Sequence, residues 1–228
     1  MSTAAPPAPT EPFDIDEAFR RLRVALAGLP KAAMFDLRDR GYPSPFEQLV
    51  GSLISARTRD ETTMAVCLRL FAVARTPEAM AALDEGTIAR LLNGASFPEP
   101  KARDLRELAR RIVADHGGAV PDTMAGLTAF RGVGPKIAAL TLAVGFDRAA
   151  VAVDVHVHRI ANRWGYVRTA TPEQTMAALE LKLPRAYWIE INERCVPFGK
   201  FICVGVGPKC STCPLRSMCP RVGVTSSR

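Results

Sequence analysis

Four cysteines near the carboxyl end of the sequence constrain this chain more than any other feature. Cys203, Cys210, Cys213 and Cys219 are spaced C-x6-C-x2-C-x5-C, with glycines and prolines between them. Four thiolates in one compact loop can bind zinc or an iron–sulfur cluster. Zinc modules with four cysteines usually carry two C-x2-C pairs, whereas this chain has only one, so the spacing favours a [4Fe–4S] cluster. A disulfide pairing and four cysteines without a metal are the other interpretations.

Composition excludes several classes of protein. The 228 residues are 48% hydrophobic and 23% charged, which suits one large globular domain or two small ones. The longest apolar run, 137–146, is about half of what a bilayer span needs, so we expect no membrane protein. No basic residue precedes Arg20 and no apolar signal segment is present, which predicts a cytoplasmic protein with reduced cysteines. A net charge of +7 favours a polyanion as partner.

Apolar spacing is helical along almost the whole chain. Ser44, Thr76 and Thr171 each precede a proline, as capping residues do at a helix start. The first and third also have Glu or Gln three residues later, which predicts two capping boxes. Only a short piece around 149–153 reads as extended. The sequence therefore predicts an all-α fold, with loose tails over 1–12 and 221–228.

A glycine turn between two expected helices, 124–130 and 135–145, is the clearest ligand-binding motif. Gly132 and Gly134 allow a tight turn and a close backbone approach to a ligand, and the first amides of the next helix can bind an anion. The pattern is that of a phosphate-binding helix-hairpin-helix. A turn of this kind can also mean only close helix packing.

Lys136 gives the hairpin its possible chemistry. Pro135 fits the first helical position, so Lys136 stands at the second, beside the positive end of the helix dipole. Such a place, with partial burial, lowers the pKa of an amine and favours its action as a nucleophile. The plainer interpretation is a solvated lysine that contacts a DNA phosphate.

Asp154 follows the apolar residues 149–153 and is expected to cap the next helix. A capping carboxylate at the edge of a cleft can also act as a base or stabilise a cationic sugar. His156 and His158 are two residues apart and face different ways on a helix, so they are interpreted as packing or phosphate contacts. Cys67 and Cys195 lie in apolar helical segments and are expected in the core.

Taken together, these motifs resemble the endonuclease III family of helix-hairpin-helix base-excision DNA glycosylases. The similarity extends from about residue 13 to 220, with the motifs in family order. They are Ser44-Pro45-Phe46-Glu47, Leu53-Ile54-Ser55-Ala56, Gly132-Val133-Gly134-Pro135-Lys136, Ala152-Val153-Asp154-Val155-His156 and the four cysteines.

This resemblance implies two helical domains that flank a DNA-binding cleft. One is a six-helix barrel of about residues 38–148 that contains the hairpin. The other, 13–37 plus 149–220, carries the [4Fe–4S] cluster on the four cysteines. The damaged nucleotide would be flipped out of the duplex into a pocket.

The resemblance also implies the site residues. Lys136 would attack the anomeric carbon, expel an oxidised pyrimidine and cut the strand by β-elimination, with Asp154 as its acidic partner. The expected partner is double-stranded DNA with a damaged base or an abasic site, bound by a monomer in the nucleoid. Gly132, Gly134 and His156 would contact this DNA. An enzyme confined to abasic sites and a cluster-bearing DNA-binding protein without turnover are the alternatives.

Three positions of this chain concern DNA contact. The family's Ser-Ala-Gln wedge reads Ser55-Ala56-Arg57, and Arg57 could stack in the gap left by the flipped base or bind the orphaned base. In the opposing loop Phe97 is the candidate wedge, with a place in the core as its alternative. Lys209 in the cysteine loop is expected to contact the DNA backbone.

Overall fold

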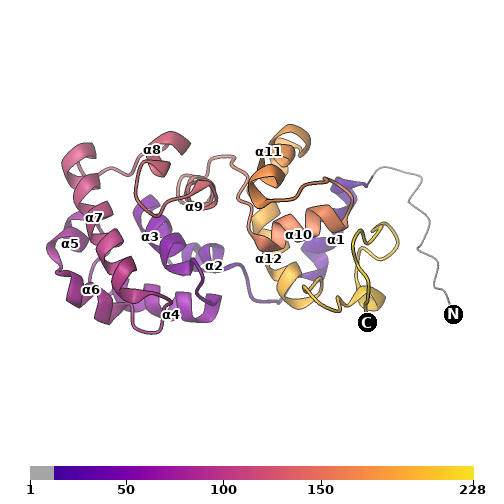
Figure 1. The fold of residues 1–228 in the computed structure, drawn as a ribbon, viewed down its shortest axis with the longest axis horizontal. Helices are drawn as coiled ribbons and strands as arrows, with labels where there is room; N and C mark the ends of the chain where they lie inside the picture. Colours follow the sequence, from indigo (N-terminus) through magenta and orange to yellow (C-terminus); the bar gives the residue numbers. More distant parts are fainter. Residues whose placement is uncertain (1–12) are drawn as a thin grey trace. The chain divides into compact units, whose positions relative to one another are not determined.

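A computed structural model describes residues 13–228 of the chain, so the tail expected over 1–12 lies outside the described residues. Within 13–228 the regular structure consists of twelve α-helices, one π-helix and two 3-10 helices, with no β-strand (Figure 1). The predicted all-α class is confirmed. The piece around 149–153, expected to be extended, has no regular secondary structure.

Two compact units divide the described chain. The central unit is Ala32–Ala152, and the terminal unit combines the described residues up to Lys31 with Val153–Arg228. The chain therefore passes from one unit to the other twice.

The central unit is built around helix α3. Every residue of this helix from Phe46 to Ile54 is buried, and α3 contacts α2, α4, α7, α9 and η1. The helix is mostly apolar, and its buried polar residues are Glu47, Gln48 and Ser52. The elements of the unit are α2 (Ala33–Asp39), α3 (Pro45–Ser55), α4 (Asp60–Phe71), α5 (Pro77–Ala82), α6 (Glu85–Leu91), α7 (Pro98–His116), α8 (Met124–Thr128), α9 (Pro135–Leu140) and the π-helix η1 (Thr141–Gly145).

The terminal unit packs around the side chains of Trp164, Phe19 and Phe198, each with at most 1% of its surface exposed. Helix α12 contacts both α1 and α10, and α10 also contacts α11. The elements of the unit are α1 (Ile15–Ala25), α10 (Val155–Arg163), α11 (Pro172–Lys182), η2 (Arg185–Tyr187), α12 (Glu190–Phe201) and η3 (Cys210–Thr212).

The expected caps are present at the helix starts, with one difference. Ser44 and Glu47 form the predicted capping box at α3, and Thr76 caps α5. Thr171 also caps α11, but the side chain of Gln174 accepts a hydrogen bond from the amide of Ala170 at 2.9 Å. The reciprocal bond predicted for Thr171 is therefore replaced by one to the preceding residue, because a long Gln side chain reaches either amide.

Residues 13–228 contain no helix with the length and apolar character that crossing a bilayer requires.

Candidate functional site

The hairpin connects α8 to α9 in the central unit. Gly132 has a φ of 80°, a left-handed conformation that favours glycine. The amide of Val133 donates to the carbonyl of Phe130 at 3.2 Å, which closes the turn. A Cβ atom at Gly134 would have no heavy atom within 4 Å, so packing within the described chain does not require glycine there. The space beside Gly134 is available for a ligand that approaches the backbone.

Lys136 occupies the predicted second position of α9. Gly134 is the capping residue and Pro135 the first helical residue, so the Lys136 side chain begins at the helix start, where the first amides have no acceptor within the helix. The side chain is half-buried and has contacts with its surroundings. A cation beside the positive end of a helix dipole is destabilised relative to the neutral amine.

Asp154 caps α10 in the terminal unit, as its sequence context predicts. Its Oδ1 accepts hydrogen bonds from the amides of His156 and Val157, both at 2.9 Å. Because both amides bind the same oxygen, capping uses only one of the two carboxylate oxygens. Asp154 and Lys136 belong to different units, and each is described within its own unit.

His156 and His158 lie on α10, each half-buried. His156 Nδ1 lies 3.1 Å from Nη2 of Arg159, and Nδ1 of His158 lies 2.6 Å from Oγ1 of Thr175. Both histidines therefore contact side chains of the terminal unit.

Arg57 and Phe97, from two separate loops of the central unit, lie next to each other. The guanidinium carbon of Arg57 is 6.0 Å from the ring centroid of Phe97, a cation–π contact. Both have left-handed backbone, with φ of 58° and 57°, which is uncommon for residues other than glycine. Phe97 has 56% of its surface exposed, so it is not part of the core.

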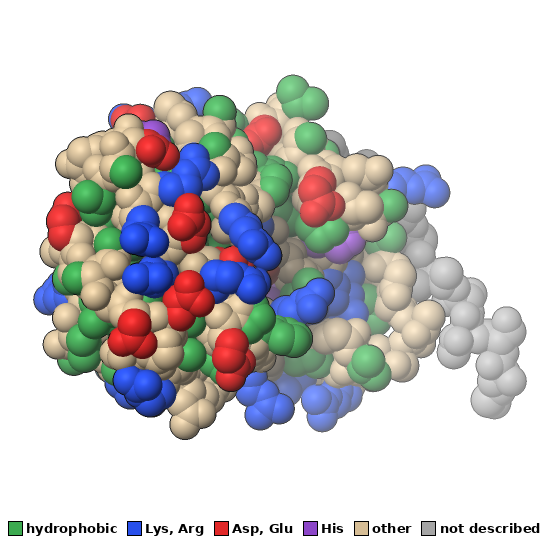
Figure 2. Space-filling view, turned by 60° about the vertical axis from the view of Figure 1, so that its left-hand side comes forward, with side chains coloured by type: hydrophobic (Ala, Val, Ile, Leu, Met, Phe, Trp, Pro, Cys, Tyr) green, Lys and Arg blue, Asp and Glu red, His purple; other side chains and the backbone are tan. Residues whose placement is uncertain are grey.

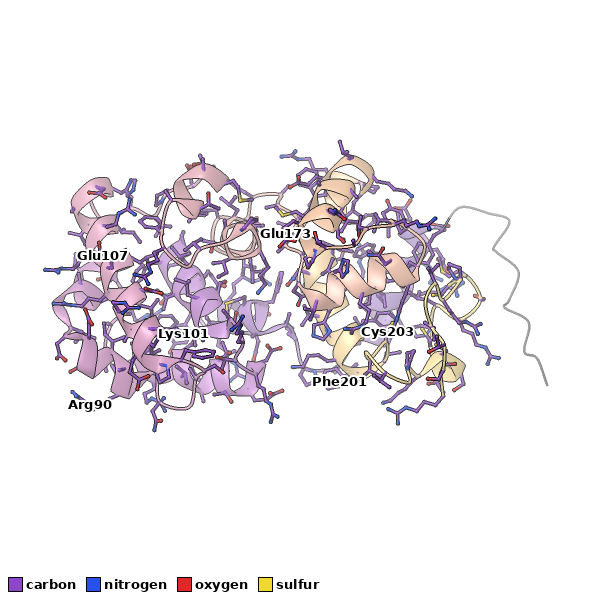
Figure 3. The ribbon with its side chains drawn as sticks, in the orientation of Figure 1. Arg90, Lys101, Glu107, Glu173, Phe201 and Cys203 are labelled. Atoms are coloured by element: carbon purple, nitrogen blue, oxygen red, sulfur yellow. The ribbon has the colours of Figure 1, made fainter. Side chains whose placement is uncertain are left out.

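Lys101 in the first turn of α7 was not singled out from the sequence. Its ammonium donates to the carbonyls of Ile54 and Ala56 at 2.7 and 2.8 Å, and to the Thr58 hydroxyl at 3.0 Å. Burial lowers the pKa of Lys101. Its partners are 43 to 47 residues away in the sequence, so a local pattern carries no signal for these bonds. Figure 3 labels Lys101 within the central unit.

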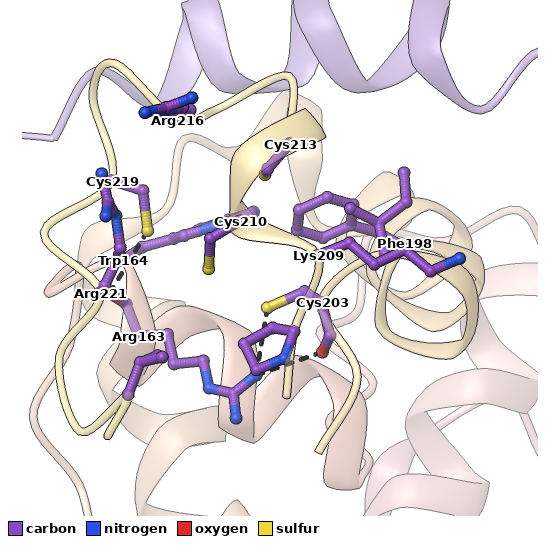
Figure 4. A pocket seen from close by; sticks show the side chains of 13 residues that line it. Arg163, Trp164, Phe198, Cys203, Lys209, Cys210, Cys213, Arg216, Cys219 and Arg221 are labelled. Atoms are coloured by element: carbon purple, nitrogen blue, oxygen red, sulfur yellow. Dashed lines mark hydrogen bonds between the residues drawn. The ribbon is translucent and has the colours of Figure 1, made fainter. Parts of the chain in front are cut away.

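All four cysteines of the C-x6-C-x2-C-x5-C pattern line one pocket of the terminal unit (Figure 4). The pocket encloses about 390 Å³ of space without atoms, part of it open to solvent. Its other lining residues are apolar or basic: Trp164, Phe198, Ile202, Pro208, Val224, Arg163, Lys209, Arg216 and Arg221. None of these is an ordinary metal ligand, so the sulfur atoms are the candidate ligands of the pocket. Among residues 13–228, no three His, Cys, Asp or Glu side chains are grouped as tightly as a metal-ion site requires.

Two of these thiols depend on a positive partner to ionise. Burial raises the pKa of Cys213 and of Cys219 to about 11 each. At neutral pH both would therefore keep their protons unless a metal supplied the charge that stabilises a thiolate. Four sulfur donors of this kind fit an iron–sulfur cluster by their chemistry.

Arg163 organises the loop that carries the first cysteine. Its guanidinium donates to Sγ of Cys203 at 3.4 Å and to the carbonyls of Val204 and Gly205, both at 2.7 Å. Arg159, one turn earlier on α10, donates to the carbonyls of Gly199 and Cys203 at 3.0 Å each. These arginines were not predicted from the sequence, and their spacing of four, on one face of α10, is the only sequence signal for them.

The end of the chain also contacts the cysteine loop. The sequence favours a loose tail over 221–228, whereas in the structure Arg228 bonds to the loop through three groups. Its amide donates to Pro208 O at 3.0 Å, its carbonyl accepts from the amide of Ser211 at 3.1 Å, and its side chain donates to Gly207 O at 3.1 Å. Lys209, in the same loop, is exposed and borders the pocket.

Cys67 and Cys195 are fully buried, which confirms their predicted place in the core. Burial raises the pKa of the Cys67 thiol to about 12, and burial also raises the pKa of the Cys195 thiol well above its usual value. Both are therefore protonated packing residues at neutral pH.

Basic and acidic side chains are interspersed on the face that Figure 2 turns toward the viewer. On the central unit, Arg131 of the hairpin lies 3.3 Å from Asp104 of α7, and Arg106 lies 3.8 Å from Glu85. Within each pair the opposite charges partly cancel.

The chain is similar to known DNA repair proteins. Residues 50–185 match the family described as HhH-GPD superfamily base excision DNA repair protein. Endonuclease III of Thermotoga maritima is 41% identical over 182 residues, which cover 80% of this chain and 85% of that protein. Endonuclease III homolog 2, chloroplastic, of Arabidopsis thaliana is 39% identical over 184 residues, which cover 77% of this chain and 48% of that protein. The chain thus spans only about half of the plant relative.

Solved structures show the same likeness. A trapped covalent intermediate of endonuclease III with DNA superposes with a TM-score of 0.79 at 26% identity, covering 90% of this chain and 93% of that one. A non-covalent complex of endonuclease III with DNA gives the same values. A thermostable thymine-DNA glycosylase, at 21% identity and a TM-score of 0.72, shares the fold.

Proposed function

The chain belongs to the endonuclease III family of the HhH-GPD superfamily of base excision DNA repair proteins, and from this premise we propose that it is a bifunctional DNA glycosylase and AP lyase. It removes oxidised pyrimidines from duplex DNA and then cleaves the strand. The observation that carries the proposal is the hairpin with Lys136 at the start of α9, in a chain that also presents Asp154 as a helix cap.

The reaction assigns one role to each side chain. The neutral amine of Lys136 attacks C1′ of the flipped nucleotide, the glycosidic C–N bond breaks, and the base leaves with the bonding electrons and takes up a proton. Asp154 accepts the proton of the lysine and stabilises the positive charge on the sugar. The C1′–O4′ bond of the sugar ring then breaks, O4′ takes up a proton, and the C1′–N bond becomes a Schiff base. This Schiff base loses a proton from C2′, and the bond from C3′ to the 3′ phosphate oxygen breaks. Water then hydrolyses the Schiff base and regenerates the amine.

DNA contacts are proposed for both units. Gly132 and Gly134 allow the hairpin backbone to approach a phosphate. A Cβ atom at Gly134 would have no heavy atom within 4 Å, so the space beside that residue is open. Arg57 and Phe97 are proposed to enter the base stack, while His156 and Lys209 contact the backbone. The partner is double-stranded DNA with a damaged base or an abasic site, which a monomer binds in the nucleoid.

Cys203, Cys210, Cys213 and Cys219 are proposed to hold a [4Fe–4S] cluster. What supports this is one pocket bordered by four cysteines, by apolar side chains and by basic side chains. With four thiolates the cluster carries a net charge of about −2 and connects three segments of the loop covalently. Its role is structural: it fixes the loop from which Lys209 reaches the DNA.

Borohydride trapping tests the reaction. The wild-type protein should form a covalent complex with duplexes that contain thymine glycol or an abasic site, and Lys136→Ala should form none. Undiminished trapping by Lys136→Ala would contradict the proposed nucleophile. Strand scission at abasic sites without release of any oxidised pyrimidine would identify an enzyme confined to abasic sites, and binding without turnover a non-catalytic protein.

Elemental analysis tests the cluster separately. The purified protein should contain about four iron atoms and four acid-labile sulfides per chain, with the visible absorption of an iron–sulfur chromophore. Cys210→Ser should lose this absorption. One zinc per chain without iron would show that the pocket is a zinc site.

A further inference from the structure

The ammonium of Lys101 joins two loops of the central unit. It bonds to the carbonyls of Ile54 and Ala56, at the carboxyl end of α3, and to the hydroxyl of Thr58. An ammonium has three N–H donors, and these three bonds use all of them. The last carbonyls of a helix have no partner within the helix, and a cation there also interacts favourably with the helix dipole.

Two of these bonds are to the residues directly before and after Arg57 in the chain. Ala56 and Thr58, its two chain neighbours, are both acceptors of the Lys101 ammonium. Arg57 has a left-handed backbone, which a residue with a Cβ atom adopts only when its surroundings hold it there. Lys101 thus fixes the segment in which the unfavourable conformation occurs.

Phe97 is tied to the same segment. The amide of Ser96 donates to Oγ1 of Thr58 at 3.2 Å, and the hydroxyl of Ser96 donates to the carbonyl of Arg57 at 2.7 Å. The amide of Lys101 donates to the carbonyl of Phe97 at 3.2 Å. The backbone and the side chain of Lys101 therefore contact both loops at once.

We propose that Lys101 is a positioning residue for the exposed Arg57–Phe97 pair, holding the pair in the conformation in which it enters the base stack beside a lesion. The inference rests on the proposed function, since it takes duplex DNA as the substrate. The two side chains lie in contact and project from strained backbone that hydrogen bonds within the protein hold, so these bonds contribute to ordering the pair.

A comparison of two substrates separates positioning from a general structural role. An abasic site in a paired duplex must be extruded from the stack, whereas the same site in a single strand is already accessible. Lys101→Met keeps the length of the side chain and removes its donors. It should slow single-turnover trapping on the duplex about tenfold or more, because a small misplacement of a positioning group has effects of this order. The rate on the single strand should stay unchanged.

Three further variants sharpen the test. Lys101→Arg keeps the charge and should recover part of the duplex rate. Ser96→Ala removes the hydrogen bond from the Ser96 hydroxyl to the carbonyl of Arg57. It should also slow trapping on the duplex and leave the rate on the single strand unchanged. Arg110→Met removes a positive charge from an exposed position of the same helix and should match the wild-type protein on both substrates.

A double-mutant cycle tests whether Lys101 acts through Phe97. If it does, Lys101→Met should add no further loss on the duplex in a Phe97→Ala background. Equal losses on duplex and single strand, or fully additive losses in the cycle, would overturn the positioning role. A wild-type protein that traps neither substrate would instead refute the proposed function itself, and circular dichroism of each variant identifies any that fails to fold.

Discussion

Replacement of Asp154 distinguishes a capping residue from a catalytic one. Its Oδ1 accepts two amide hydrogen bonds at the start of α10, as a capping residue that stabilises the helix does. The proposed role as a base requires the negative charge as well. Asparagine keeps an oxygen that caps a helix and lacks the charge, whereas alanine lacks both.

The expected magnitudes differ strongly for the two roles. Loss of an N-cap to alanine costs about 1 kcal/mol, with a range of about 0.5–2 kcal/mol, and asparagine caps as well as aspartate does. Loss of the charge beside the helix dipole costs about 0.3–1 kcal/mol. For a protein of this size, 1 kcal/mol lowers Tm by about 2–4 °C. Removal of a general base slows a reaction by about 10²–10⁴-fold.

Thermal unfolding and single-turnover trapping together provide the assay. Asp154→Asn should lower Tm by about 4 °C or less and slow trapping on abasic DNA by at least about a hundredfold at 25 °C. Asp154→Ala should lower Tm further and show a similar rate. At 25 °C a loss of about 1 kcal/mol leaves nearly all molecules folded, so unfolding cannot account for the slower reaction.

One outcome would refute this reasoning. If Asp154→Asn reacts at nearly the wild-type rate, the charge is not needed and Asp154 is a capping residue only. The lysine must then transfer its proton to another group, and the assignment of the acidic partner is wrong.

Three further predictions concern stability. Glu47→Gln should lower the free energy of unfolding, measured in urea titrations, by about 1–2 kcal/mol. The reason is that the carboxylate, which is 2% exposed, loses its 2.7 Å ion pair with the half-exposed Arg75. An unchanged free energy of unfolding would show that this ion pair contributes nothing to stability. Gly199→Ala should lower the free energy of unfolding by about 1–3 kcal/mol by the same measurement, because the new Cβ atom would lie 2.5 Å from Nδ1 of His156. An unchanged free energy of unfolding would mean that the His156 ring moves aside without cost. Burial raises the pKa of Cys67 from 9.0 to about 12, so the folded state holds this proton more tightly than the unfolded state does. The contribution of this thiol to stability is present below pH 9 and is lost as pH rises toward about 12. The Cys67→Ala variant should therefore lose less stability than the wild-type protein over that pH range. If both proteins lose stability equally, the raised pKa of Cys67 is contradicted.

Helix starts could be predicted from the sequence because their signals are local. A cap side chain bonds an amide two or three residues away, as Ser44 and Asp154 do, so a window of a few residues contains the whole interaction. The capping box predicted at Thr171 was wrong in one bond. The side chain of Gln174 accepts from the amide of Ala170, because a flexible side chain can reach more than one nearby amide.

The candidate site divides in the same way. The cysteine spacing and the glycine turn before Lys136 are features of short segments, and the structure has all four cysteines at one pocket. The sequence suggested Arg57 and Phe97 as wedge residues but left Phe97 open as a core residue; its exposure excludes the core.

The all-α class, the starts of about half of the α-helices and the segments that carry chemistry could be predicted from the sequence, because each depends on hydrogen bonds or spacing within one turn or loop. The side chains that support those segments could not be predicted, because they come from distant parts of the chain. Lys101 reaches acceptors 43 to 47 residues away, and Arg163 reaches a carbonyl 42 residues away. Such bonds exist because packing brings distant segments together, and no short stretch of sequence contains both partners.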